Sequence, residues 1–139
     1  MEQYRQIAPE RGSEFAPNPC IVESKTVRVL PDWEGLESYS KEAESLCCEL
    51  DRDSPWEAYE DALVRIECLV DYATLIGGYP RWVQGEAKSH CSSCGADREL
   101  VVQIDSEELA GLMWGDMGLV YLFSCKSHPD DFHLELQCH

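Results

Sequence analysis

The chain has 139 residues, a common size for one domain and enough to bury a hydrophobic core. Its 27 acidic and 11 basic side chains give a formal charge of −16 at pH 7, which excludes nucleic acids and anionic membranes as expected partners and favours a basic protein. No apolar run is long enough to cross a bilayer, and the first residues lack the apolar stretch of an export signal, so we expect a cytoplasmic protein.

The first part of the chain is expected to contain a loose arm, an extended segment and a helix. Residues 1–19 hold spaced glycine and proline without helical or strand periodicity, which is typical of an arm. Residues 20–30 mix β-branched and charged side chains and predict a strand or hairpin arm that ends at Pro31. Residues 33–50 repeat apolar side chains at three- and four-residue steps, which predicts one amphipathic helix with a buried stripe.

A second helix is predicted to begin at Pro55. Ser54 is a candidate cap, proline suits the first helical position, and Glu57 can reach back to the N–H of Ser54. Apolar positions from Trp56 onwards predict a buried face that continues to about Tyr72. Three cysteines lie within these helices and are expected to pack as small apolar side chains: Cys47, Cys48 and Cys68.

From residue 75 onwards the pattern becomes strand-like. Two glycines and a proline in residues 77–80 enforce a turn, and residues 99–105, 118–125 and 132–138 each predict a strand. In the last of these, apolar side chains alternate with polar ones. A short helix opened by serine is predicted over residues 106–110.

Two pairs of potential metal ligands share one spacing. Cys91 and Cys94 are separated by two residues, and Cys125 and His128 repeat this gap. Such a gap lets both side chains converge on one ion, and Gly95 relieves the backbone of the first turn. Close cysteine pairs without an export signal are more typical of metal ligation than of disulfides. We therefore predict a zinc ion bound by Cys91, Cys94, Cys125 and His128.

The predicted donor set also indicates the role of the ion. Four protein ligands leave no position for water or substrate, so structural zinc is expected rather than catalytic zinc. Four other donors compete with His128 for the last position: Cys138, His139, His90 and His133. The sequence contains no glycine-rich phosphate loop, nucleophile elbow or His-Glu-x-x-His motif, so no enzymatic activity is predicted.

The order of motifs resembles a known family. The motifs are Gly77-Gly78-Tyr79-Pro80 with Trp82-Val83-Gln84, Cys-x-x-Cys-Gly, Gln103-Ile104-Asp105-Ser106, Trp114-Gly115-Asp116 with Gly118, Tyr121 and Phe123, and finally Gln137-Cys138. They resemble the YwqG-like family, domain of unknown function 1963, from about Leu75 to His139, and residues 30–33 show a weaker similarity to the same family. The resemblance implies an α+β fold with N-terminal helices packed on a curved, mostly antiparallel sheet. Residues 20–139 would form a single domain, helical over about 33–72 and β-structured with the zinc site over about 75–139.

Two binding roles come with this resemblance. Related domains are similar to those encoded beside polymorphic secreted toxins, which implies an immunity protein that occludes a toxin. A more distant similarity to the programmed-cell-death-2 group implies a dedicated chaperone for a ribosomal protein. An acidic chain complements either basic partner. We expect an immunity protein, with the chaperone and an uncharacterised enzyme as alternatives, and the sequence predicts no oligomeric state.

Overall fold

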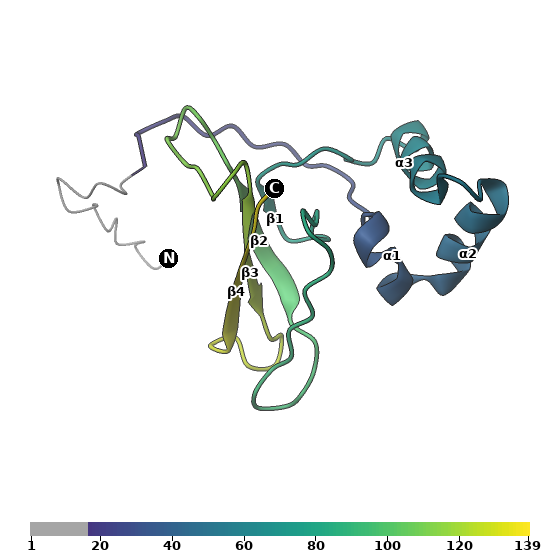
Figure 1. Cartoon of the computed structure of the whole chain (residues 1–139). Coiled ribbons are helices and arrows are strands. Elements are labelled where there is room, and N and C mark those ends of the chain that lie inside the picture. Colours follow the sequence, from purple (N-terminus) through teal and green to yellow (C-terminus); the bar gives the residue numbers. More distant parts are fainter. Residues whose placement is uncertain (1–16) are drawn as a thin grey trace.

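The computed structural model describes residues 17–139 (Figure 1). Three helices come first: α1 (Trp33–Tyr39), α2 (Lys41–Leu50) and α3 (Pro55–Arg65). Four antiparallel strands follow in the spatial order β1-β2-β3-β4: β1 (Leu75–Ile76), β2 (Glu99–Asp105), β3 (Leu119–Ser124) and β4 (Phe132–Gln137). The expected α+β class is confirmed. None of the helices in this part of the chain has the length and apolar character needed to cross a membrane.

The N-terminal segments differ from their predictions. Most of the predicted arm, residues 1–16, lies outside the described part of the chain, and residues 17–19 are exposed without regular structure. The strand predicted over residues 20–30 does not form, and only an isolated bridge pairs Arg28 with Cys68. Ile21 and Val22 are exposed. Their β-branched side chains favour a strand, but no neighbouring strand pairs with them in the described chain.

The single helix predicted over residues 33–50 is two helices that meet at Ser40. Ser40 has an extended backbone, with φ −156° and ψ 96°, and its hydroxyl accepts a hydrogen bond from the N–H of Ala43 at 3.2 Å. The serine therefore caps a new helix where the apolar periodicity alone predicts continuation. Asp32 caps α1 in the same way, because its carboxylate accepts from the N–H of Gly35 at 2.9 Å.

The helix α3 begins at Pro55, as predicted, but the predicted side-chain cap does not form. Ser54 makes no side-chain cap hydrogen bond, and the carboxylate of Asp51 instead accepts from the N–H groups of Asp53 and Ser54, both at 3.0 Å. The helix ends at Arg65, well before the predicted end at Tyr72, and the left-handed φ of 57° at Glu67 turns the chain away.

The helices bury a small core of their own. Its buried members are Leu36, Cys47, Tyr59 and Leu63. Several side chains that were predicted to be buried are exposed instead, among them Leu46, Cys48, Leu50, Trp56 and Ile66. Short helices that change direction at Ser40 cannot keep one continuous stripe buried, so part of that stripe faces solvent.

The strands agree closely with the sequence analysis. All three predicted strands are confirmed to within one residue at each end, and the two-residue β1 adds a fourth. Trp82 packs on the inner face of the sheet with four strand residues: Leu100, Leu119, Tyr121 and Phe123. The helix predicted over residues 106–110 is absent, because the hydroxyl of Ser106 donates to Gly118 O at 2.8 Å and accepts from Trp114 N–H at 3.1 Å instead of capping a helix.

One segment, residues 81–84, joins the helices to the inner face, and we call it the anchor segment. Each of its four backbone N–H groups is bound by the side chain of a buried residue, because buried N–H groups require partners. Gln103 binds Arg81 N–H at 2.9 Å, Asp32 binds Trp82 N–H, and Gln137 binds the N–H groups of Val83 and Gln84 at 3.1 and 3.0 Å. Polar side chains thus lie in the core to hold this segment.

Asp32 has a double role in this arrangement. Its carboxylate caps α1 and also accepts from the anchor segment, so it ties the first helix to the sheet. Burial raises the pKa of Asp32, and the N–H groups of Trp82 and Gly35 and the Arg81 guanidinium offset part of that rise.

Candidate metal centre

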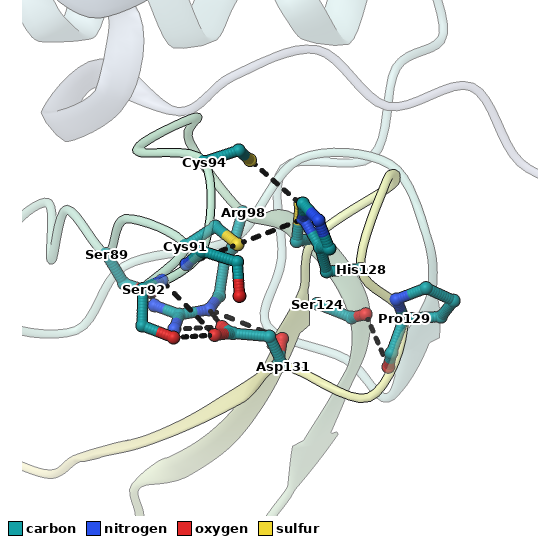
Figure 2. A network of polar contacts seen from close by, with 11 residues as sticks. Ser89, Cys91, Ser92, Cys94, Arg98, Ser124, His128, Pro129 and Asp131 are labelled. Carbon is teal, nitrogen blue, oxygen red and sulfur yellow. Dashed lines mark hydrogen bonds and ion pairs between the residues drawn. The ribbon is translucent and has the colours of Figure 1, made fainter.

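Two turns at one end of the sheet carry the predicted ligands (Figure 2). Cys91 and Cys94 lie in the turn that precedes β2, and Cys125 and His128 lie in the turn between β3 and β4. The first residue of β2 pairs with the last residue of β3, so antiparallel register brings the two turns side by side.

The four donor atoms converge. The three sulfurs and a ring nitrogen of His128 all lie within 4.8 Å of one another. The Nδ1 of His128 is 3.5 Å from the Sγ of Cys91 and 3.7 Å from that of Cys125, and the Sγ atoms of Cys94 and Cys125 are 3.7 Å apart. Sulfurs in a disulfide are about 2.05 Å apart, so these thiols are not bonded to each other. The cluster can hold a metal ion.

The first turn has the shape of a knuckle. The N–H of Cys91 donates to Ala96 O at 2.8 Å, and the N–H of Gly95 donates to Cys91 O at 2.9 Å. Gly95 has a φ of 73°, a left-handed conformation that suits glycine, as expected from its place after the second cysteine. The N–H of Ser93 points to the Sγ of Cys91 at 3.4 Å. The N–H of Ser93 therefore favours the thiolate form of Cys91.

The thiols influence one another's pKa. Burial raises the pKa of Cys91, but hydrogen bonds from the N–H groups of Cys94 and Ser93 and from the neighbouring thiols outweigh it and lower the pKa to about 6. The pKa of Cys94 is raised: the N–H of Ala96 lowers it, but the neighbouring thiols of Cys91 and Cys125 together raise it more. Thiolates this close repel one another, and a cation between them relieves that repulsion.

The other donors that the sequence left as competitors lie elsewhere. Cys138 follows β4 at the opposite end of the sheet. His90 pairs with Asp97 at 2.7 Å, His133 with Glu135 at 3.3 Å, and the ring of His139 lies beside that of Tyr72. The structure therefore brings together Cys91, Cys94, Cys125 and His128 and none of the alternatives.

Sequence reasoning missed a polar bridge between the two turns. The carboxylate of Asp131, in the second turn, accepts hydrogen bonds from the N–H and hydroxyl of Ser92, in the first turn. The same carboxylate pairs with the guanidinium of Arg98, which also donates to the hydroxyl of Ser89 at 2.9 Å (Figure 2). The hydrogen bond from Ser92 and the charge of Arg98 lower the pKa of Asp131, although burial opposes them. No motif spacing marks these residues, because they meet only when the turns do.

The fold and the cluster define a class: a small α+β domain with a four-donor metal cluster at one end of an antiparallel sheet. The model of the domain of unknown function 1963 (DUF1963) matches residues 10–131, so the chain belongs to that family. The match confirms the YwqG-like assignment and corrects its extent, since it includes the helices and ends before β4. The similarity to the programmed-cell-death-2 group stays a prediction. No curated protein matches the chain.

Proposed function

We propose that this chain is an acidic, zinc-stabilised protein-binding module that neutralises a basic partner toxin, as an immunity protein does. The uncompensated charge of the helices carries the proposal. Residues 33–65 contain ten acidic side chains, Glu34, Glu37, Glu42, Glu44, Glu49, Asp51, Asp53, Glu57, Glu60 and Asp61, against three basic ones, Lys41, Arg52 and Arg65. Such a surface attracts a basic protein and speeds encounter with it.

Most of these carboxylates form no ion pair with a side chain of the described residues. Among the described residues, only Glu37 of the ten lies in an ion pair, with Lys41 at 3.6 Å. The remaining carboxylates stay available for the arginines and lysines of a partner. Toxins that act on nucleic acids carry basic faces that bind phosphate, and an acidic protein can cover such a face.

The same helices expose apolar side chains. Leu46 and Leu50 are one turn apart on α2 and both are exposed, close in helical position to Glu42 and Glu49. Interfaces combine apolar anchors with surrounding polar groups, so this mixture suits binding better than solubility alone. We place the partner's contact on this side of α2.

We assign the metal as structural zinc. Tetrahedral zinc with Zn–S bonds of about 2.3 Å and Zn–N bonds of about 2.05 Å separates two sulfurs by about 3.8 Å and sulfur from nitrogen by about 3.6 Å. Three of the six donor separations lie close to these values: 3.7 Å between the Cys94 and Cys125 sulfurs, and 3.5 and 3.7 Å from His128 to Cys91 and Cys125. Three thiolates and one imidazole leave no coordination position for substrate, which supports a structural role.

Charge reversal on α2 tests the binding role. The tagged chain should capture a basic protein at low salt and release it at high salt, because screening weakens charge complementarity. Glu42→Lys with Glu49→Lys should reduce capture by at least about tenfold, a loss of about 1.4 kcal/mol. The control, Glu107→Lys with Glu108→Lys, makes the same charge change on an exposed loop after β2 and should bind more tightly than the α2 variant. Capture of no basic protein at low salt, or equal loss in both variants, would contradict the proposal.

The biological role needs a second measurement. When the captured partner is expressed alone it should be toxic, and co-expression of this chain should abolish the toxicity. A chaperone for a ribosomal-type protein would instead keep its partner soluble without suppressing any toxicity. A gene for a secreted protein with a variable C-terminal domain immediately upstream would support the immunity role.

A further inference from the structure

The outer face of the sheet is apolar. A sheet with one face in water usually carries polar side chains on that face, whereas a sheet covered on both sides is apolar on both. Here the inner face is packed against Trp82, and the outer face carries eight apolar side chains: Ile76, Val102, Ile104, Val120, Leu122, Phe132, Leu134 and Leu136. Composition therefore marks this as a sheet that is buried on both faces.

These side chains form continuous rows. The strand register places Ile76, Val102, Leu122 and Leu134 opposite one another across all four strands, and residues directly opposite share a face. A second row contains Ile104, Val120 and Leu136. Exposure is greatest on the outer strands, with Ile76 at 90%, Leu134 at 63%, Phe132 at 59% and Leu136 at 47%. A contiguous apolar surface of this kind marks an interaction site.

The outer face also differs from the rest of the molecule in charge. Its only charged strand residue is Glu99, at the metal-cluster end, where Lys126 lies 3.8 Å away. The acidic helices lie on the other side of the sheet, where Asp32 reaches the anchor segment on the inner face (Figure 1). The surface is therefore neutral in a chain of formal charge −16.

We infer that this face binds a second copy of the chain, with two sheets packed face to face. A basic partner needs carboxylates opposite its cations, and the outer face offers none along its rows. A second copy presents the same neutral rows, and a two-fold axis between them makes the surface self-complementary. This arrangement also places the two acidic helical units on the outer sides of the dimer, where their mutual repulsion is weakest.

The size of the face limits the area that the association can bury. Three strands of six or seven residues and the two-residue β1, at about 3.3 Å per residue and about 4.8 Å between strands, give a face of about 300 Å² in projection. Two facing sheets then bury on the order of 1,000 Å² in total, at the lower limit for a specific interface. The expected product is a reversible dimer that forms as the concentration rises. Its affinity should increase with salt, because salt screens the repulsion between two acidic chains.

Sedimentation velocity of the full chain under reducing conditions, over roughly 1–300 µM, tests this inference at concentrations where a weak, reversible dimer would form and dissociate. Leu134→Lys and Ile76→Lys each place a charge on the apolar rows that the dimer would bury, and each should weaken dimerisation at least about tenfold. The control is Leu50→Lys on α2, where the leucine is 79% exposed and lies away from the sheet, and it should leave the dimer unchanged. Circular dichroism checks that each variant is folded, and Phe132→Lys replaces any that is not.

Each other outcome would overturn the inference. A wild-type chain that stays monomeric at every concentration and salt would refute the pairing of two copies through this face. Loss of the dimer in Leu134→Lys but not in Ile76→Lys would indicate pairing through the β4 edge, since Ile76 lies on the opposite edge strand. Equal loss in Leu50→Lys would place the interface on the helices. The proposed binding of a basic partner is independent of all three results.

Discussion

Replacing Gln137 by leucine should destabilise the whole fold, although it puts an apolar residue in the core. The side chain of Gln137 accepts from the N–H groups of Val83 and Gln84 at 3.1 and 3.0 Å and donates to Gly85 O at 2.9 Å. Leucine has a similar size but removes all three hydrogen bonds. Three backbone groups of the segment that joins helices and sheet then lose their partners.

The size of the effect follows from those three bonds. A hydrogen bond contributes about 1 kcal/mol net, and a buried group left unpaired costs about 1–3 kcal/mol. Water can reach Gln84, so its N–H recovers part of its loss. We therefore expect Gln137→Leu to lower the free energy of unfolding by about 3–5 kcal/mol, a large part of the 5–15 kcal/mol typical of a domain.

Urea unfolding followed by tryptophan fluorescence measures this loss, since Trp82 lies in the sheet core. The matched control is Gln84→Leu, the same chemical change at an exposed glutamine with one side-chain hydrogen bond, to Cys138 O. That variant should lose about 1 kcal/mol or less. A loss below 1 kcal/mol in Gln137→Leu, or equal losses in the two variants, would refute the reasoning.

Four further predictions follow, three on the metal cluster and one on the break between α1 and α2. Cys125→Ser should lose the ion and unfold the C-terminal half, because structural zinc contributes about 10–16 kcal/mol of apparent binding energy. Metal analysis with circular dichroism checks this, and a folded, metal-free variant would contradict it. Asp131→Ala should weaken metal affinity about 10–100-fold in a chelator competition, since it removes the bridge between the turns, and unchanged affinity would exclude that role. Calorimetry in buffers of different ionisation enthalpy should show that more protons are released per metal ion bound below pH 6 than above it. The reason is that the Cys91 thiol, with a pKa of about 6, is protonated before binding at the lower pH. An equal number of released protons at both pH values would contradict the lowered pKa of Cys91. Ser40→Ala should cost about 1 kcal/mol in urea unfolding by removing the cap of α2, and no loss would indicate that packing alone makes the break.

The metal cluster was more predictable from sequence than the network that supports it. A two-residue gap is a local property, so the spacing of Cys91, Cys94, Cys125 and His128 identifies residues that the structure indeed brings together. The bridge of Arg98 and Asp131 depends on two turns that lie 33 residues apart in the chain. Single charged residues of this kind usually face solvent, and only the strand register shows that these two meet.

The same contrast between local and distant effects explains the secondary structure. Alternation and β-branched residues predicted β2, β3 and β4, because every strand was paired by a neighbour. Residues 20–30 carry a similar signal and form no strand, since among the described residues only the isolated bridge from Arg28 to Cys68 pairs with them. Ser40 and Ser106 are both serines with the potential to cap a helix, but Ser40 binds the N–H of Ala43 whereas Ser106 binds distant backbone groups. Tertiary structure therefore decides whether a serine side chain caps a helix or binds distant backbone groups.

The anchor segment also has a consequence for the order of folding. Its N–H groups are bound by Asp32, 50 residues before Trp82, and by Gln137, 54 residues after Val83. During synthesis the helices are complete long before Gln137 is made, yet the segment that docks them needs this glutamine from the last strand. Contacts of such long sequence separation form slowly, because loop closure must precede them. We therefore expect the helices to dock fully only after β4 has formed. The last strand of the chain thus completes the docking of its first part.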